Sequence, residues 1–234
     1  MRSPRLALLA TLALALLLVS CNVTTTIEKQ VYLDEDFSDG LSGWSQFDSR
    51  LDDDSPAGNW YVQDGKLVQG NDCWGGGTSE GWSYFQGTQL HYGDESWRDY
   101  RFSVDVTPAN DNGVGVYSRI STVSENSRRY IRVFIMNNPL YGGPYWRLDM
   151  RDNTESYAAL VKNQNVGFVV GETFRVIMEV EGGEIRVYNG SRNNLVLEFD
   201  LTDNWHDELY AGKVGLMAFK HPGIRFDNVK IEEL

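Results

Sequence analysis

The sequence predicts an all-β protein in which two antiparallel sheets pack face to face, with little or no helix outside a signal peptide. Residues 100–107 alternate strictly between apolar and polar side chains, as in a strand with one buried face. Residues 212–231 contain two more such strands, separated by a turn at His221-Pro222-Gly223. No segment of the remaining chain has a helical period of useful length, although residues 203–210 are expected to hold one helical turn.

The last strand carries an irregularity that fixes its place. After Phe226 the apolar side chains move from even-numbered to odd-numbered positions, which predicts a bulge at Asp227 or Asn228. A strand that keeps its apolar alternation both before and after a bulge must be paired within a sheet. We therefore expect it to return beside the opening strand, residues 31–37.

The strands in between are predicted from the same alternation, with tight turns at Asp64-Gly65 and Gly182-Gly183. The alternation weakens between residues 70 and 93, which form either an aromatic binding loop or a long connection crossing between sheets. The side chains expected to face the core are Trp60, Val62, Leu67, Val68, Tyr100, Phe102, Val104, Val106, Val114, Val116, Ile131, Val133, Ile135, Trp146, Leu148, Met150, Phe174, Val176, Met178, Val180, Ile185, Val187, Leu195, Leu197, Phe199, Val214, Leu216, Ala218, Ile224 and Phe226.

Three stretches carry a family resemblance. They are Gly212-x-Val-Gly-Leu followed by Phe226-Asp-Asn-Val, Trp60-x-x-x-Asp-Gly-x-Leu, and Tyr100-x-Phe-x-Val-x-Val. Together they resemble the concanavalin A-like (LamG-like) jelly-roll superfamily, close to bacterial extracellular domains related to 3-keto-disaccharide hydrolases and to carbohydrate-binding modules. The resemblance covers residues 31–234. It implies a jelly-roll sandwich whose concave sheet is the usual ligand surface, and it specifies the fold better than the activity.

The N-terminus predicts a lipoprotein signal peptide over residues 1–20. Arg2 and Arg5 precede an apolar run over residues 6–19, which is short for a membrane span. The run ends in Leu-Val-Ser-Cys21, which resembles a bacterial lipobox with Cys21 as the lipidated residue; the alternative is an ordinary cleaved signal with a chance cysteine. Residues 21–30 would form a polar tether. Asn22 in place of aspartate favours the outer membrane, and the protein is expected in the bacterial cell envelope, anchored to the lipid bilayer and extracytoplasmic.

Charge limits the partners. Removing residues 1–20, which hold two arginines and no acidic residue, takes the formal net charge from −12 to −14. This acidity argues against nucleic acid as a partner.

The candidate ligand surface is the sheet face opposite the core. Aromatic, guanidinium and carboxylate side chains occupy it on three neighbouring strands, a combination that suits the stacking and planar hydrogen bonding by which sugars are bound. The candidate ligand-binding residues are Tyr117, Arg119, Tyr130, Arg132, Tyr145, Arg147 and Asp149. The alternative is an ordinary exposed sheet with cross-strand pairs, and one register slip would invert the individual residues.

A structural calcium is the one cofactor considered. Jelly rolls of this kind often carry calcium near the chain ends, and Asp36 and Asp227 could converge as oxygen ligands. The alternative is that Asp227 accepts backbone hydrogen bonds in the bulge.

Signs of catalysis are weak. Glu179-Val-Glu-Gly-Gly-Glu184 matches the outer spacing of the laminarinase motif Glu-x-Asp-x-x-Glu, but a Gly-Gly turn interrupts it. Cys73, the only thiol left once Cys21 is lipidated, is either a nucleophile or, more simply, a partly buried free cysteine. Three hypotheses remain: a glycan-binding lipoprotein, a hydrolase or lyase of modified glycosides, and a structural or protein-binding envelope component.

Overall fold

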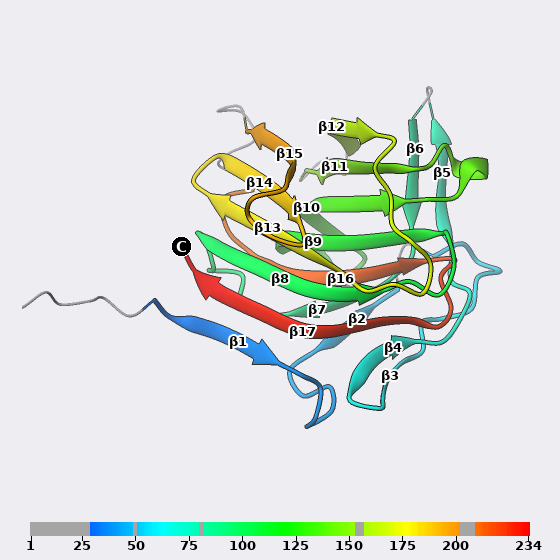
Figure 1. Cartoon of the computed structure of the whole chain (residues 1–234), viewed down its shortest axis with the longest axis horizontal. Coiled ribbons are helices and arrows are strands. Elements are labelled where there is room, and N and C mark those ends of the chain that lie inside the picture. Colours follow the sequence, from blue (N-terminus) through cyan, green and yellow to red (C-terminus); the bar gives the residue numbers. More distant parts are fainter. Residues whose placement is uncertain (1–28, 49–50, 80–81, 153–156, 202–208) are drawn as a thin grey trace, which may run out of the picture.

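The computed structural model describes residues 29–48, 51–79, 82–152, 157–201 and 209–234. Two antiparallel sheets lie on top of each other, and the chain runs back and forth between them (Figure 1). This confirms the predicted all-β jelly-roll sandwich. Residues 202–208, which include most of the predicted helical turn, lie outside the described part, as do Cys21 and the signal segment.

Sheet A has the strand order β15-β14-β13-β8-β17-β4-β3, and β1 also pairs with β17. Its strands are β1 (Val31–Glu35), β3 (Trp60–Gln63), β4 (Lys66–Gln69), β8 (Tyr100–Thr107), β13 (Phe174–Glu181), β14 (Glu184–Asn189), β15 (Leu195–Asp200) and β17 (Ile224–Glu233).

Sheet B has the order β12-β11-β10-β9-β16-β7-β2. Its strands are β2 (Ser45–Phe47), β7 (Thr88–Tyr92), β9 (Gly113–Ser124), β10 (Ser127–Met136), β11 (Tyr145–Arg151), β12 (Tyr157–Gln164) and β16 (Lys213–Phe219). A separate hairpin of β5 (Gly75–Ser79) and β6 (Trp82–Gln86) stands at one end of the sandwich, and a short 3₁₀ turn spans Pro139–Tyr141 (Figure 1). Within the described residues no helix has the length and apolar character needed to cross a bilayer.

The closing strand lies where the sequence predicted. β17 pairs with β1, β4 and β8, so the first and last strands of the domain lie side by side within sheet A. The pairing with β8 slips between Asp227 and Lys230, and Asn228 has a left-handed backbone with φ +48°. The bulge expected at this point is confirmed, and it lets both halves of β17 direct apolar side chains into the core.

The core between the sheets holds nearly all of the side chains predicted for it. Each of the strands β8, β9, β10, β11 and β13 contributes alternate apolar residues to one continuous buried cluster. Val62, Phe174 and Phe199 are only partly buried against it. Leu195 is 48% exposed, because the pairing of β14 with β15 slips next to it and shifts it out of phase with Leu197.

The turn between β16 and β17 connects sheet B to sheet A, and the side chain of His221 holds this turn in place through hydrogen bonds. His221 is fully buried; its Nε2 accepts hydrogen bonds from the backbone N–H groups of Ala109 at 3.0 Å and Asn110 at 3.1 Å. Its Nδ1 lies 3.1 Å from the carbonyl oxygen of Asn112, so the ring is neutral with its proton on Nδ1. Burial lowers the pKa of His221 from 6.5 to about 4.

Stability should therefore fall as the solution is acidified below the ordinary histidine pKa. The unfolded chain takes up a proton near pH 6.5, whereas folded His221 does not until about pH 4. Between these pH values, protonation of His221 in the unfolded chain should lower the free energy of unfolding by about 1.4 kcal/mol for each unit by which the pH falls. Urea unfolding of the wild type and of His221→Gln between about pH 7 and about pH 5 measures this slope. In His221→Gln the free energy of unfolding should depend less on pH, by the contribution of this one proton. Equal pH slopes in the two proteins would contradict a neutral, buried His221 ring.

Candidate functional site

Six of the seven candidate residues come together on one face of sheet B. Cross-strand pairing places Arg132 between Tyr117 on β9 and Asp149 on β11, so three side chains form a row across the sheet. Tyr130, Tyr145 and Arg147 lie on the same side of β10 and β11, while the alternate residues point into the core. The prediction that these six side chains point away from the core is confirmed.

The expectation that this face is open to water is wrong. Each of the six side chains is at most 3% exposed. The β5–β6 hairpin covers the face: the ring of Phe85 packs against Phe134 and Phe219 with centroid distances of 6.0 and 4.8 Å. A second apolar cluster, separate from the core between the sheets, fills this space.

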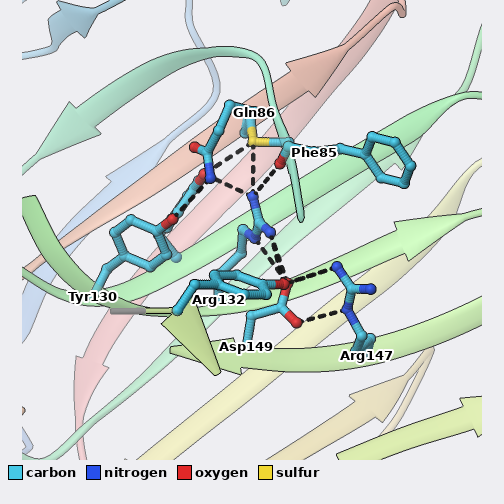
Figure 2. Close-up of polar contacts among 9 residues, drawn as sticks. Phe85, Gln86, Tyr130, Arg132, Arg147 and Asp149 are labelled. Carbon is cyan, nitrogen blue, oxygen red and sulfur yellow. Dashed lines mark hydrogen bonds and ion pairs between the residues drawn. The ribbon is translucent and has the colours of Figure 1, made fainter. Parts of the chain in front are cut away.

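Polar contacts also bind the hairpin to the sheet. Arg132 Nη1 donates to the carbonyl oxygen of Phe85 at 2.7 Å, and Gln86 Nε2 donates to the hydroxyl of Tyr130 at 3.1 Å (Figure 2). The hairpin therefore closes the face through both apolar packing and hydrogen bonds.

Asp149 is the centre of the buried polar network. Figure 2 shows its carboxylate between the guanidinium groups of Arg132 and Arg147. Arg132 Nη2 donates to Asp149 Oδ2 at 2.7 Å, and Arg147 Nε donates to Asp149 Oδ1 at 2.6 Å. Arg132 and Arg147 also donate to the hydroxyl of Tyr157, at 3.3 and 2.8 Å. These are charge-assisted bonds among groups nearly closed to water.

The network keeps its charges despite burial. Burial acts to lower the pKa of Arg132, but the oxygens of Tyr117 and Asp149 outweigh it and raise that pKa well above its usual value. The pKa of Arg147 is raised in the same way, against its burial, chiefly by Asp149. Burial raises the pKa of Tyr157, so its hydroxyl stays protonated. Within this network, two guanidinium groups share one carboxylate, which leaves an excess of one positive charge.

Arg119 does not belong to this network, which corrects the prediction. The pairings of β9 with both of its neighbours slip around this residue, and its backbone is left-handed with φ +52°. The extra residue of the bulge turns its side chain away from the row. Its Nη1 instead donates to the carbonyl oxygen of Leu209 at 3.1 Å, and its Nη2 lies 3.7 Å from Asp99.

Among the described residues, the edge of this face along β6 and β12 is less buried than its centre. The rings of Tyr84 on β6 and Tyr157 on β12 stack with centroids 4.9 Å apart, and both are half-buried. Lys162, farther along β12, is also half-buried, and its Nζ lies 4.0 Å from the ring centroid of Tyr145. We call Tyr84, Tyr157 and Lys162 the rim.

Sequence reasoning missed the rim residues. The aromatic residues of the 70–93 segment were a signal, but the glycine-rich strand β5 and the mixed strand β6 lack the alternation that reveals a hairpin. Residues 157–164 show no aromatic or charge pattern that singles out Tyr157.

The two candidate calcium ligands do not form a metal site. Asp227 Oδ2 lies 2.6 Å from Lys66 Nζ, and Asp227 Oδ1 accepts from the N–H of Asn228 at 2.8 Å. Asp36 is exposed, and its Oδ1 accepts from the N–H of Ser38 at 3.0 Å. Among the described residues no three histidine, cysteine or acidic side chains are grouped as metal ligands. The alternative interpretation of Asp227 therefore holds: its carboxylate accepts a backbone hydrogen bond in the bulge.

The two candidate catalytic groups are held by structural contacts. Glu179 is 2% exposed and forms ion pairs with Arg101 and Arg192, both at 2.7 Å, on sheet A. Cys73 is buried and its Sγ accepts from Gln69 Nε2 at 3.2 Å; burial raises the pKa of the thiol to about 11. At neutral pH it is a protonated thiol, which is a poor nucleophile.

Comparison with known proteins identifies the fold. No protein-family model matches the sequence, and no curated protein matches it. Among solved structures, a protein of unknown function with a galectin-like fold from Bacillus subtilis superposes with a TM-score of 0.63 at 8% identity, over 88% of this chain and 98% of that one. The carbohydrate-binding module CBM66 from Bacillus subtilis gives 0.58 at 13% identity, over 82% and 97%.

The exoplasmic/lumenal domain of VIP36, in its Ca²⁺- and mannose-bound form, gives 0.53 at 10% identity, over 82% and 83%. The described part of the chain therefore has the concanavalin A-like jelly-roll fold. At these identities the likeness establishes the fold and no activity.

Proposed function

We propose that the protein binds carbohydrate, and that the ligand meets the polar face of sheet B at its rim. The stacked, half-buried pair of Tyr84 and Tyr157 carries this proposal. A sugar is recognised by packing its C–H face on an aromatic ring while charged groups hydrogen-bond its hydroxyls. Carbohydrate-binding and lectin-like domains with the same fold support the proposal.

The buried network would position the rim. The hydroxyl of Tyr157 accepts hydrogen bonds from both Arg132 and Arg147, so the ring is fixed from behind rather than free to rotate. Lys162 supplies a charged donor farther along β12, next to the ring of Tyr145. A binding surface that is ordered before the ligand arrives loses less side-chain entropy on binding. Arg132, Arg147 and Asp149 thus act through Tyr157, whereas Tyr84, Tyr157 and Lys162 would touch the sugar.

Affinity electrophoresis in gels that contain a panel of neutral and acidic polysaccharides tests this function. Tyr84→Ala and Tyr157→Ala should each weaken retention about tenfold, which corresponds to about 1.4 kcal/mol for a lost ring contact. Tyr61→Ala is the matched control, because Tyr61 is an exposed tyrosine on sheet A. The proposal fails if no polysaccharide retains the protein, or if Tyr61→Ala weakens retention as much as the rim variants.

We further propose that Cys21 is lipidated and anchors the domain on the outer side of a bacterial membrane, the outer membrane in a Gram-negative cell. The apolar run that ends at Cys21 supports this, and several acyl chains on one residue give stable anchoring. Cys21→Ser should move the protein from the membrane to the soluble fraction of cells and abolish its labelling by radioactive palmitate. Labelling that persists in Cys21→Ser would contradict the anchor.

A further inference from the structure

A pocket of about 480 Å³ opens where the two ends of the domain meet. It lies between β1, the segment that precedes β8, and the end of β17. In Figure 1 the end of β17, marked C, lies on the side of the sandwich away from the β5–β6 hairpin. Its lining residues are Tyr32, Ser96, Trp97, Arg98, Asp99, Glu233 and Leu234. A volume of this size admits a ligand as large as a monosaccharide or larger.

An aromatic pair forms one wall of the pocket. The rings of Tyr32 and Trp97 stack with centroids 4.7 Å apart and an interplanar angle of 23°. The backbone on both sides of Trp97 holds it in place: its N–H donates to Asp94 and its carbonyl oxygen accepts from Gly212. Residue 93 must be glycine, because φ is +105° there and a Cβ atom would overlap the Trp97 ring.

Two acidic residues, Asp99 and Glu233, line the same pocket as the aromatic pair. Burial, together with the negative charges of Glu233 and Asp99, raises the pKa of the Tyr32 phenol. Asp99 Oδ1 accepts from the N–H of Gly182 at 2.8 Å and lies 3.7 Å from Arg119 Nη2, but the side chain of Asp99 is still 41% exposed. Glu233 is exposed at the end of β17.

Arg98, the basic residue among the described lining residues, packs against the ring of Tyr210. The guanidinium carbon of Arg98 lies 4.6 Å from the ring centroid of Tyr210. Aromatic rings and carboxylates therefore dominate the pocket, in a chain whose formal net charge is −12. Both kinds of group attract cations, the ring through its electron-rich face and the acid through its charge.

We propose that this pocket is a second ligand site, and that it takes an amino sugar with a free ammonium group. The ammonium would lie between the carboxylates of Asp99 and Glu233, and the sugar ring would pack against Tyr32 and Trp97. The site is separate from the rim on sheet B and does not depend on the function proposed there.

NMR titration of the protein with glucosamine at about pH 6, where an amine of this kind is charged, tests the proposal. Glucosamine should shift the Trp97 indole signal and its neighbours, whereas N-acetylglucosamine, which is neutral and similar in shape, should not. Glu233→Gln should weaken binding about threefold, as expected for an exposed charge pair, and Asp99→Asn combined with Glu233→Gln by more. Asparagine at position 99 keeps an acceptor for the N–H of Gly182.

Glu172→Gln is the control, because Glu172 is an exposed acid in the connection between β12 and β13. It should leave glucosamine binding unchanged, as should Tyr84→Ala at the rim. Equal shifts with N-acetylglucosamine, no shifts with glucosamine, or full affinity in the Asp99/Glu233 double variant would each overturn the proposal.

Discussion

Replacement of Asp149 by asparagine is expected to lower the free energy of unfolding by about 3–5 kcal/mol, the usual cost of removing one partner from a buried ion pair. Asp149 is fully buried and is the carboxylate between the guanidinium groups of Arg132 and Arg147. Asparagine has the same shape but no charge, so two buried positive charges would repel each other without compensation. Urea unfolding at neutral pH, followed by tryptophan fluorescence, measures the loss.

An exposed acid gives the comparison for this variant. Glu198 lies 3.5 Å from Arg186 on sheet A and its side chain is 62% exposed. Glu198→Gln should change stability by less than about 1 kcal/mol, because water already solvates both charges. If Asp149→Asn cost no more than Glu198→Gln, the network would not be sealed from solvent.

Replacement of Phe85 by alanine is expected to detach the hairpin from sheet B at a cost of about 3–5 kcal/mol, the usual range for a buried phenylalanine. The Phe85 ring packs among Phe134, Phe219 and Tyr141, and its backbone carbonyl accepts from Arg132. Without the ring, the stacking of Tyr84 on Tyr157 would be the remaining ring contact between the described side chains of the hairpin and sheet B. Hydrogen exchange resolved along the chain should show faster exchange in β6 and in the facing part of β10.

Val123→Ala provides the control for Phe85→Ala. Val123 is 37% exposed near the end of β9, so its loss should leave exchange in β6 unchanged. Slow β6 exchange in Phe85→Ala would mean that the hairpin is held by contacts other than the Phe85 ring.

Local alternation was enough to predict the sandwich and its core. Tyr100, Phe102, Val104 and Val106 alternate without interruption, and all four are fully buried. A strand with one buried side has a side-chain period of two, so the apolar pattern shows directly which residues face the core. The phase change after Phe226 marked the bulge for the same reason.

The state of the polar face could not be predicted in this way. The pattern of β9, β10 and β11 shows that Tyr117, Arg132 and Asp149 point away from the core, but not what lies against them. The answer is in a hairpin distant in sequence, whose first strand begins Gly75-Gly-Gly and whose two strands carry no regular alternation. A polar row can face water or a covering element, and only tertiary contacts distinguish the two.

Arg119 shows the same limit on a smaller scale. Counting by twos from Tyr117 places it on the polar face, whereas the bulge in β9 directs it toward Leu209 and Asp99. At Asp227 the slip left a trace, because apolar residues continued on both sides of it. After Ser118 the next apolar residue, Ile120, keeps the even-numbered phase of Val114 and Val116, so the sequence leaves no trace of the slip, although Ile120 packs in the second apolar cluster.

Side-chain oxidation by hydroxyl radicals, read out tyrosine by tyrosine, measures most directly whether sheet B has a covered polar face with an accessible rim. Tyr117 and Tyr130, at 0% and 2% exposure, should resist oxidation until the protein unfolds, while Tyr61, at 38%, should react readily. Tyr84 and Tyr157 should react at intermediate rates and become protected by a polysaccharide that the protein retains. Oxidation of Tyr117 and Tyr130 at the rate of Tyr61 would show that the face is open to solvent, contrary to the structure described above.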